Sequence, residues 1–530
     1  MLQRLDPCSK KTLQTPSESA WWYRNESSVD ILLTELRSLI TNLGKNGGLI
    51  SPSVYDTAQV LRLCPPQQGV RPAVDWLLEQ QQADGGWGNP AVPLTRDVPT
   101  LASVLALHTY GNCKATGDAA RAGLTFLQQQ VGQWKQPQPD DLPVGVELLL
   151  PRMLNEAAAL GLELPREPYA TLVAMGEQRR RLIAQIQPGA GTTAAHSWEA
   201  WGTDPDPTLI DGSGGVGGSP AATAAWLHIV DRHTDLADVC EAAQRYLVQA
   251  AVSTSLGIPG VVPTAWPITG FEQAYGLYAL LIAGLLDHPT LQDVVQPQIH
   301  DLARALRPTG LGWSEFFSPD GDDTAVAVAV LRAAEHQVDI AILKRFENND
   351  HFCTYSGELQ PSLIATAHAV HALALSSEEV ARPRTFLIKR QCPDGRWLAD
   401  KWHSSWLYTT LEVVLALTNS GHITALKSVV DAMLAHQHAD GGWGMGSKST
   451  ATETAYGVLT LRTLRAYGLL GQGSLDALRK AHQWLLHNYR SFNVSKDKCW
   501  IGKELYRSCR VDRAFELSAM LALTLEEGCQ

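Results

Sequence analysis

Three aspartates lie within four positions of the chain, at Asp320, Asp322 and Asp323, and the apolar run 325–331 follows them directly. Carboxylates this close together at the start of a buried helix cannot all ionise at little cost, so at least one should keep its proton near neutral pH. A protonated carboxylic acid beside an apolar pocket can protonate a very weak base such as an alkene. The alternative interpretation is an acidic helix N-terminus that stabilises the helix dipole.

A motif of the form Q-x-x-D-G-x-W occurs three times and indicates how the helices are joined. Its copies are at 81–87, 391–397 and 437–443. Each copy follows an apolar helical stretch and precedes another one. Asp-Gly favours a turn, the Gln side chain can bond backbone groups at a helix end, and the Trp ring can pack against that end. We interpret the repeats as structural staples at helix–helix corners.

Helical periodicity dominates between the repeats. Apolar residues recur at spacings of three and four in segments such as 101–107, 413–417 and 456–464. Alternating strand patterns are scarce. Helices joined by Gly- and Pro-containing loops favour an all-α fold in which paired helices form rings. The Gly-rich stretch 211–219 interrupts the first half, and the non-helical stretch 257–267 precedes another helix, so we expect a domain boundary near residue 290.

Composition excludes several classes of protein. The chain has 530 residues, so we expect two domains or one large helical domain. Its formal net charge is −11 and no Lys/Arg block stands out, which argues against nucleic acid as a partner. No apolar run reaches the ~18 residues of a membrane span, and residues 1–22 contain no signal-peptide core. The nine cysteines form no C-x-x-C pair, so we expect a cytoplasmic location.

Several motifs spread over nearly the whole chain carry a family resemblance. They are S-V-Y-D-T-A at 53–58, H-S-W-E at 196–199, G-S-P-A-A-T-A at 218–224, D-G-D-D-T at 320–324, D-K-W-H-S-S at 400–405 and W-I-G-K-E-L-Y at 500–506. With the repeats, they resemble the bacterial class II terpene cyclases of the copalyl diphosphate synthase type. The resemblance implies two α/α-barrel domains with the active site between them. The β domain would comprise residues 1–25 and 290–530, and the inserted γ domain residues 26–289.

The resemblance also implies a reaction. A linear prenyl diphosphate, most often geranylgeranyl diphosphate, would be protonated at its terminal alkene, close its rings in sequence and lose a proton while keeping its diphosphate. Asp322 would be the general acid, and Asp320 and Asp323 would orient it and hold the proton through hydrogen bonds. Thr324 would cap the helix that carries them. The enzyme would be an isomerase that forms a bicyclic diterpenyl diphosphate.

Carbocation intermediates need an apolar cavity whose aromatic faces stabilise positive charge. We expect five aromatic residues in segments near the acid to contribute to this cavity and to bind the substrate. They are Trp266, Tyr275, Trp313, Phe316 and Phe317. Ordinary core packing is the alternative role for each of them.

The base that ends the reaction determines the product. Plant enzymes that make ent-copalyl diphosphate use a His and an Asn to hold a water, and alignment with their motifs places Gln273 and Phe316 at these two positions. Loss of that early base would prolong the life of the cation and permit hydride and methyl shifts. We therefore expect a rearranged bicycle of the halimadane or clerodane (kolavenyl-like) type as readily as a plain labdane of the copalyl type.

The diphosphate requires Mg²⁺ and cationic side chains. Mg²⁺ prefers one or two carboxylates together with phosphate oxygens, and similarity to the family's acidic stretch makes Glu199 the candidate metal ligand. Lys401, Lys503 and Arg96 are the candidates for binding the diphosphate. An ordinary salt bridge is the alternative role for each of these cations.

The sequence lacks the D-D-x-x-D and N-D-x-x-S-x-x-x-E motifs that ionise a diphosphate. A separate terpene synthase or phosphatase should therefore act next, and a homodimer is compatible with this reading. Three other functions stay open: a drimenyl diphosphate synthase acting on farnesyl diphosphate, a squalene-type cyclase, and a non-enzymatic α/α-toroid binding module. A binding module would keep the repeats but has no reason to keep the three clustered aspartates.

Overall fold

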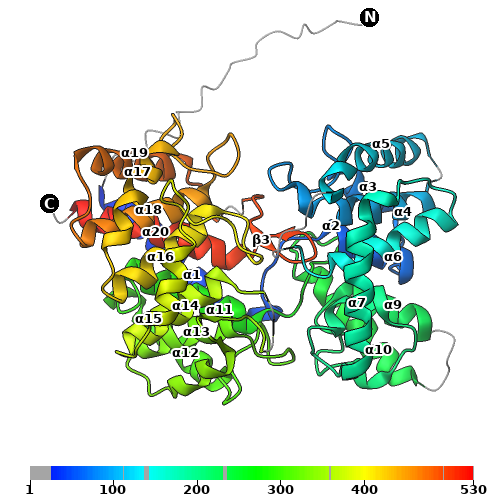
Figure 1. The fold of residues 1–530 in the computed structure, drawn as a ribbon, viewed down its shortest axis with the longest axis horizontal. Coiled ribbons are helices and arrows are strands. Elements are labelled where there is room, and N and C mark those ends of the chain that lie inside the picture. Colours follow the sequence, from blue (N-terminus) through cyan, green and yellow to red (C-terminus); the bar gives the residue numbers. More distant parts are fainter. Residues whose placement is uncertain are drawn as a thin grey trace, which may run out of the picture.

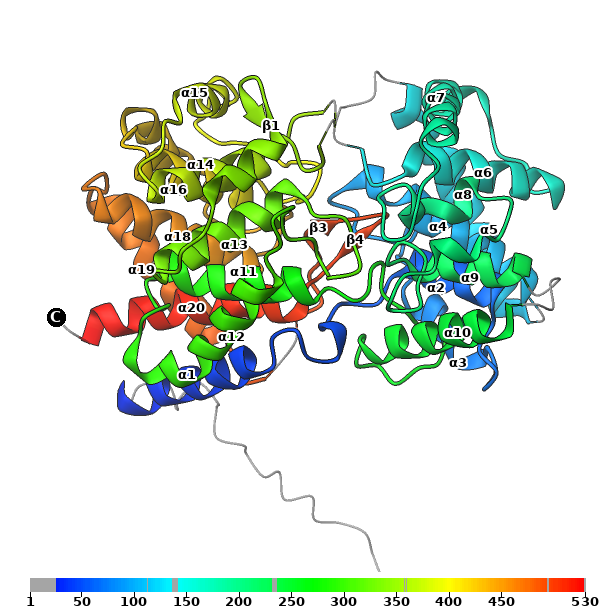
Figure 2. The same ribbon diagram turned by 90° about the horizontal axis from the view of Figure 1, so that it is seen from below.

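The computed structural model of the chain describes residues 25–528, except 112, 136–141, 231–235, 357, 359, 493 and 494. Two bodies of helices lie side by side (Figures 1 and 2). The described part is mainly helical, as the sequence predicts, with two short antiparallel hairpins. These are β1 (Glu347–Asn348) with β2 (His351–Phe352), and β3 (Trp500–Ile501) with β4 (Leu505–Tyr506).

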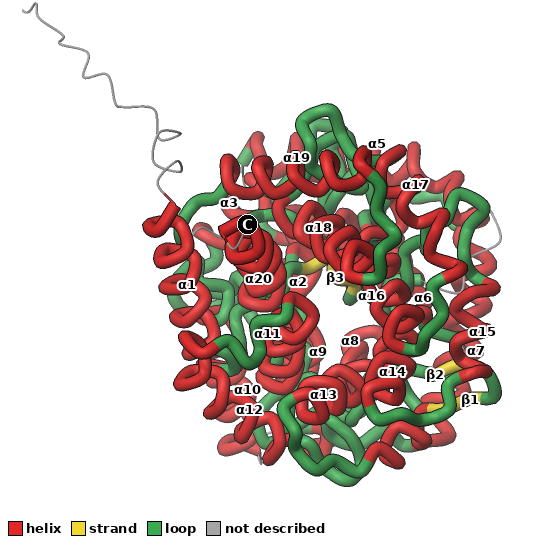
Figure 3. The backbone as a smooth tube through the Cα atoms, turned by 90° about the vertical axis from the view of Figure 1, so that its left-hand side faces the viewer, coloured by secondary structure: helices red, strands yellow, loops and turns green. Residues whose placement is uncertain are grey.

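One body, the β domain, is a double ring of helices (Figure 3). In its inner ring each helix packs on the next and the last packs on the first. The inner helices are α11 (Thr269–Ala283), α13 (Gly321–Ala333), α14 (Leu363–Leu375), α16 (Trp406–Asn419), α18 (Ala451–Ala466) and α20 (Cys509–Gly528). The outer helices are α1 (Asn25–Thr41), α12 (Gln292–Ala305), α15 (Ala381–Lys389), α17 (Lys427–Ala435) and α19 (Gln472–Asn488).

The other body, the γ domain, repeats this arrangement with a second closed ring. Its inner helices are α2 (Val54–Leu63), α4 (Asp97–Thr109), α6 (Val146–Ala159), α8 (Trp198–Trp201) and α9 (Pro220–Val230). Outside them lie α3 (Arg71–Glu79), α5 (Lys114–Gln130), α7 (Ala170–Ile186) and α10 (Ala237–Val252). No helix in the described ranges is both long enough and apolar enough to cross a membrane.

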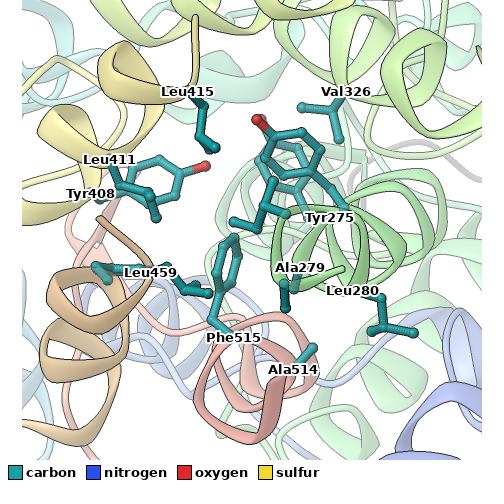
Figure 4. Packing of buried hydrophobic residues seen from close by; sticks show 14 of the residues in the cluster. Tyr275, Ala279, Leu280, Val326, Tyr408, Leu411, Leu415, Leu459, Ala514 and Phe515 are labelled. Carbon is teal, nitrogen blue, oxygen red and sulfur yellow. The ribbon is translucent and has the colours of Figure 1, made fainter. Parts of the chain in front are cut away.

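Burial differs between the two layers. In the inner helix α13 every residue from Gly321 to Leu331 is buried, because neighbours contact it on all sides. Figure 4 shows how such helices fill the β domain, with Tyr275, Tyr408 and Phe515 coming from three different inner helices. The outer helix α5 buries only a stripe of its residues. This is the pattern expected of helices packed in two concentric layers.

The three Q-x-x-D-G-x-W segments do staple helix corners. In the first, Gln81 Nε2 donates to the carbonyls of Gly85 (2.8 Å) and Ala119 (2.9 Å). The other two copies make the same bonds, from Gln391 to Gly395 and Ala425 and from Gln437 to Gly441 and Ala477. Gly85 has a φ of +88°, and a Cβ there would lie 2.6 Å from the carbonyl oxygen of Ala122, so this turn requires glycine.

The division between the domains differs from the predicted γ domain of 26–289. Helix α1 packs on α12 and α20 of the β domain, and Leu32, Leu36 and Ile40 are fully buried in that core. Helix α11 belongs to the inner ring of the same domain. The amphipathic stripe of α1 predicts a helix with one buried face, but it does not say which surface covers that face.

The buried cores give the division directly. One core contains residues from 32 to 50 and from 265 to 523, whereas the other two contain residues from 54 to 266. The chain therefore crosses between the domains near residues 51–53 and again near 263–267. The predicted β-domain segment 1–25 lies outside the described residues except for Asn25.

Candidate active site

The three aspartates lie at the N-terminus of α13, at the end of the β domain that faces the γ domain. Asp320 is the N-cap, and its side chain accepts hydrogen bonds from the backbone N–H groups of Asp322 (3.0 Å) and Asp323 (2.8 Å). Thr324 does not cap this helix; its hydroxyl accepts a hydrogen bond from the backbone N–H of Leu311 (2.9 Å). Both interpretations of the cluster therefore apply, because Asp320 caps the helix while Asp322 faces a cavity.

Asp322 is held from two sides by residues of neighbouring inner helices. Tyr275 of α11 donates its hydroxyl hydrogen to Oδ2 (2.9 Å), and Nδ1 of His368 in α14 lies 2.6 Å from Oδ1. The opposite ring nitrogen of His368, Nε2, lies 3.0 Å from Oε2 of Glu412 in α16. His368 and Glu412 were not predicted from the sequence. The signal that could have identified them is a polar residue in the middle of an otherwise apolar helix.

Burial and mutual repulsion keep protons on this cluster. Burial raises the pKa of Asp320 to about 8, with the charge of Asp322 adding to the shift and backbone hydrogen bonds opposing it. Burial and the charges of Asp320 and Asp322 raise the pKa of Asp323 well above its usual value. Burial lowers the pKa of His368, but the carboxylates of Asp322 and Glu412 outweigh burial and raise it to about 10. An imidazolium therefore stands beside Asp322 at neutral pH.

A cavity lies between the domains and has the aspartates in its wall. Both domains line it, with residues such as Tyr275 and Trp313 from the β domain and Val144 and His196 from the γ domain. Among the described residues, no Lys or Arg lines the cavity. An apolar chain could therefore enter it with its reactive end against the acids, while a highly charged group would remain outside.

Three of the five predicted aromatic residues line the cavity: Tyr275, Trp313 and Phe317. Trp266 and Phe316 are not among its lining residues. The indole N–H of Trp266 donates to the carbonyl of Asn46 (3.1 Å), and the Phe316 ring packs against Gly212. Both lie close in sequence to lining residues but point elsewhere, because sequence proximity does not fix the direction of a side chain in a loop.

Other aromatic residues complete the cavity wall, and Trp500 of β3 is the most connected of them. Its ring centroid lies 5.1 Å from Phe271, 5.5 Å from Tyr275 and 5.2 Å from Tyr408. Its indole N–H donates to buried Asp512 (2.7 Å). Further rings in the wall belong to Tyr355, Trp402 and Tyr506. Phe271 could have been found from the sequence, since it lies one helical turn before Tyr275.

The three cations predicted to bind the diphosphate are each paired with a carboxylate. Arg96 belongs to the first staple, where its guanidinium makes two 2.8 Å hydrogen bonds to Asp84, away from the cavity. Lys401 Nζ lies 2.6 Å from Oε1 of Glu358. Lys503 is fully buried, and its Nζ donates to Glu199 (2.6 Å) and to Ser219 (2.7 Å). These pairings match the alternative role considered for each cation, an ordinary salt bridge. Because Lys503 belongs to the β domain and Glu199 to the γ domain, the W-I-G-K segment also ties the two domains together.

Glu199 is not placed to bind Mg²⁺. One carboxylate oxygen receives hydrogen bonds from Lys503 and from the Tyr55 hydroxyl (3.0 Å), and it is therefore already neutralised. The other oxygen is buried without a partner. Among the described residues, no group of three or more His, Cys, Asp or Glu side chains could hold a metal ion. Glu199, engaged by Lys503 and Tyr55, therefore does not fit the predicted role of Mg²⁺ ligand.

The two residues aligned with the plant His–Asn pair, Gln273 and Phe316, are not among the residues that line the cavity. Gln273 points away from the cavity, and its amide donates to Gln298 (3.0 Å). The cavity instead contains His196, from the H-S-W-E motif, whose Nδ1 donates to the carbonyl of Gly217 (2.9 Å). Burial and nearby Lys503 lower the pKa of His196 to about 3. His196 is therefore neutral at physiological pH, with the unprotonated nitrogen at Nε2.

Comparison with known proteins identifies relatives over the whole length. A family model for the squalene-hopene cyclase C-terminal domain matches residues 360–503. The (+)-kolavenyl diphosphate synthase of Herpetosiphon aurantiacus is 52% identical over 514 residues, which cover 94% of this chain and 99% of that protein. The ent-copalyl diphosphate synthase of Streptomyces sp. strain KO-3988 is 31% identical over 514 residues, covering 90% and 93%.

Among solved structures, the ent-copalyl diphosphate synthase from Streptomyces platensis superposes with a TM-score of 0.75 at 26% identity, covering 94% of this chain and 99% of that chain. The two-ring architecture and the full-length sequence similarity therefore agree. The chain belongs to the bacterial class II diterpene cyclases.

Proposed function

We propose that the protein converts geranylgeranyl diphosphate into a bicyclic diterpenyl diphosphate, mainly of the rearranged, kolavenyl type. The observation that carries this proposal is the position of Asp322, held between Tyr275 and His368 in the wall of an aromatic-lined cavity. The 52% identity to a kolavenyl diphosphate synthase favours a rearranged product over the plain labdane of the more distant ent-copalyl relatives.

The first step is a proton transfer from Asp322 to the terminal alkene. The alkene π electrons form the new C–H bond and leave a tertiary carbocation, and Asp322 becomes a carboxylate. The His368 imidazolium and the Tyr275 hydroxyl stabilise this carboxylate more strongly than the neutral acid, and so they lower the barrier. Asp323, whose pKa burial raises well above its usual value, holds a proton that can reload Asp322.

Ring closure then moves positive charge along the cavity. Each alkene in turn supplies its π electrons to the cation, so two carbon–carbon bonds form and the charge advances past the faces of Phe271, Trp313 and Trp500. Such faces can each stabilise a desolvated cation by roughly 2 kcal/mol. No bond to the diphosphate breaks, so the product is an isomer of the substrate and needs a separate enzyme to ionise or hydrolyse it.

The weakness of the available base favours rearrangement. His196 could remove a proton from the first bicyclic cation, which would give a labdane. Because burial and Lys503 lower its pKa to about 3, His196 is a poor base, and proton removal is correspondingly slow. Hydride and methyl shifts can then precede proton loss.

Mg²⁺ has no step in this mechanism. Its fitting role is to bind the diphosphate group of the substrate, because Mg²⁺ keeps several waters and binds through phosphate oxygens. In that role the metal would neutralise the diphosphate outside the aromatic cavity.

Incubation with geranylgeranyl diphosphate and Mg²⁺, followed by phosphatase treatment and gas chromatography–mass spectrometry, tests the proposal. A bicyclic C20 alcohol from the native protein, absent with Asp322→Asn, would support it, and the skeleton would distinguish rearranged from labdane products. Asp301→Asn, at an exposed salt bridge, is the matched control and should keep activity. Geranylgeraniol as the sole product would contradict the C20 proposal. A parallel incubation with farnesyl diphosphate tests the drimenyl alternative.

A further inference from the structure

Behind the acid, a buried polar network continues from His368 through Glu412 and Tyr278 to His371. Glu412 is 1% exposed, and its Oε2 lies 3.0 Å from His368 Nε2 and accepts a hydrogen bond from the Tyr278 hydroxyl (2.7 Å). Tyr278 in turn lies 2.9 Å from Nδ1 of His371. Because the Tyr278 hydrogen is used on Glu412, Nδ1 of His371 must donate to the Tyr278 oxygen. The network therefore directs hydrogen-bond donors toward the carboxylate of Glu412.

The charge of Glu412 has one compensating cation. In the described part of the chain, no Lys or Arg forms an ion pair with Glu412, and His368 is its recorded ion-pair partner. The titratable groups around His368 are Tyr275 and Tyr278 from α11, Asp322 from α13, His371 from α14, and Tyr408 and Glu412 from α16. A buried carboxylate without a cation is strongly disfavoured, so Glu412 and His368 depend on each other for their charged forms.

Two histidines on α14 show how neighbouring carboxylates change the pKa of a buried imidazole. His368 and His371 are both buried and lie one helical turn apart. Among the described residues His371 forms no ion pair with a carboxylate, and burial together with the charge of His368 lowers its pKa to about 3. His368, between two carboxylates, has a pKa of about 10 despite its burial. The neighbouring carboxylates, and not the helix or its burial, decide which imidazole is charged.

We propose that Glu412 is a positioning residue for the cyclisation: it holds His368 doubly protonated, with Nδ1–H directed at Asp322, and thereby makes Asp322 a stronger acid. Tyr278 and His371 support this role by directing hydrogen bonds toward the Glu412 carboxylate. The inference rests on the proposed function, because it concerns the strength of the acid in that reaction. Glu412 touches neither the substrate cavity nor the reacting atoms.

The physical reason lies in the charge balance of proton transfer. With Glu412 ionised and His368 protonated, loss of the Asp322 proton creates an ion pair between Asp322 and an existing cation. If Glu412 is neutral, His368 loses the anion that stabilises it while Asp322 still carries its proton, and it tends to become neutral. Asp322 would then have to ionise beside an uncharged imidazole in a low-dielectric site, which is much less favourable.

The test is Glu412→Gln, with kcat, KM and the pH profile measured on geranylgeranyl diphosphate. We expect kcat to fall at least tenfold with KM nearly unchanged, and the alkaline limb of activity to move at least one pH unit lower, because His368 then deprotonates more easily. Glu412→Asp keeps the charge and should restore part of the activity and of the alkaline limb. The matched control is Glu453→Gln, a second buried glutamate of the β domain, which hydrogen-bonds Ser405 and not the acid cluster.

The outcomes separate this inference from the proposed function. If the native protein forms no bicyclic product, the proposed function fails. If it does, and Glu412→Gln keeps the native pH profile or loses activity equally at every pH, the positioning role is wrong. Should Glu412→Gln fail to fold, Tyr278→Phe replaces it, because this change removes one hydrogen bond to Glu412 and leaves the carboxylate in place. We then expect a threefold or larger loss of kcat with the same direction of pH shift, and an unshifted profile would overturn the proposal.

Discussion

Each domain contains an inner helix with the residues D-T-A at its third to fifth positions, and the two sites differ in their chemistry. In the γ domain, Thr57 of α2 accepts a hydrogen bond from the backbone N–H of Val262 (3.1 Å). In the β domain, Thr324 of α13 does the same with Leu311 (2.9 Å). The two helices thus share one hydrogen bond, in which a threonine in the first turns of an inner helix accepts from the backbone of a loop that lies beside it.

The aspartates beside these threonines have different partners. Asp56 lies 3.8 Å from Lys503 and accepts hydrogen bonds from Ser53 (2.8 Å) and from the backbone N–H of Ala221 (3.3 Å). Burial raises its pKa to about 7, with Lys503 opposing the shift. Burial and the charges of Asp320 and Asp322 instead raise the pKa of Asp323 well above its usual value. The same motif therefore gives an interdomain anchor in one domain and a carboxyl group that keeps its proton in the other.

Removal of the acid should have the largest effect of any change at the two sites. We expect Asp322→Asn to lower the rate of cyclisation by roughly 10²–10⁴-fold, the range typical of general acids, because an amide cannot supply the proton. Product formation measured by gas chromatography–mass spectrometry checks this. Asp56→Asn, at the equivalent helix of the γ domain, should affect stability more than chemistry. A larger rate loss in Asp56→Asn than in Asp322→Asn would break the comparison.

Removal of the cation should destabilise the γ-domain site. Lys503→Met leaves Glu199 and Asp56 buried without a cation, and removal of one partner from a buried ion pair costs roughly 3–5 kcal/mol. Chemical denaturation followed by circular dichroism measures the loss. Lys114→Met at an exposed pair with Asp118 is the control, where a change below about 1 kcal/mol is expected. Equal losses in the two variants would show that Lys503 is not an anchor.

The acid cluster should make stability depend on pH. Its Asp320 has a pKa of about 8 in the folded protein, above the ordinary 3.8, so the folded state binds more protons than the unfolded state. The free energy of unfolding should therefore fall as pH rises from about 4 to about 8. Asp320→Asn, which can still cap the helix, should flatten the dependence of stability on pH. An unchanged slope would contradict this assignment.

The two threonines should show the smallest and most similar effects. Thr57→Val and Thr324→Val each leave one buried backbone N–H without its acceptor, which costs roughly 1–3 kcal/mol. Unfolding of both variants should show comparable destabilisation. The rate of cyclisation, normalised to folded protein, should fall for Thr324→Val alone, since Thr324 adjoins the acids. Loss of activity in Thr57→Val at constant stability would show that the γ-domain helix acts on the chemistry.

Much of the fold could be predicted from the sequence, because its signals are local. The three Q-x-x-D-G-x-W staples each use residues within a few positions, and their hydrogen bonds repeat in all three copies. Apolar periodicity predicts helices for the same reason. The placement of α1 could not be predicted, because its apolar stripe of Leu32, Leu36 and Ile40 is compatible with either domain.

The candidate site likewise has a part that could be predicted from the sequence and a part that could not. The cluster Asp320, Asp322 and Asp323 is visible in the sequence, since repulsion between close carboxylates requires only their spacing. The direction of Trp266 and Phe316 was not predictable, because each lies in a loop whose conformation depends on distant contacts. Lys503 and Glu199 were expected to bind diphosphate and metal, yet they are paired with each other across 304 positions of the chain.

The sequence by itself determined the helical rings, their staples and the position of the acids, because periodicity, turns and like-charge repulsion act over a few residues. The tertiary structure decided which carboxylate receives which cation. His368 is 46 positions from Asp322 and becomes its partner only when α13 and α14 lie side by side. In a low-dielectric interior a single neighbouring charge outweighs the intrinsic preference of a group. The fold therefore makes one D-T-A helix an anchor and the other an acid.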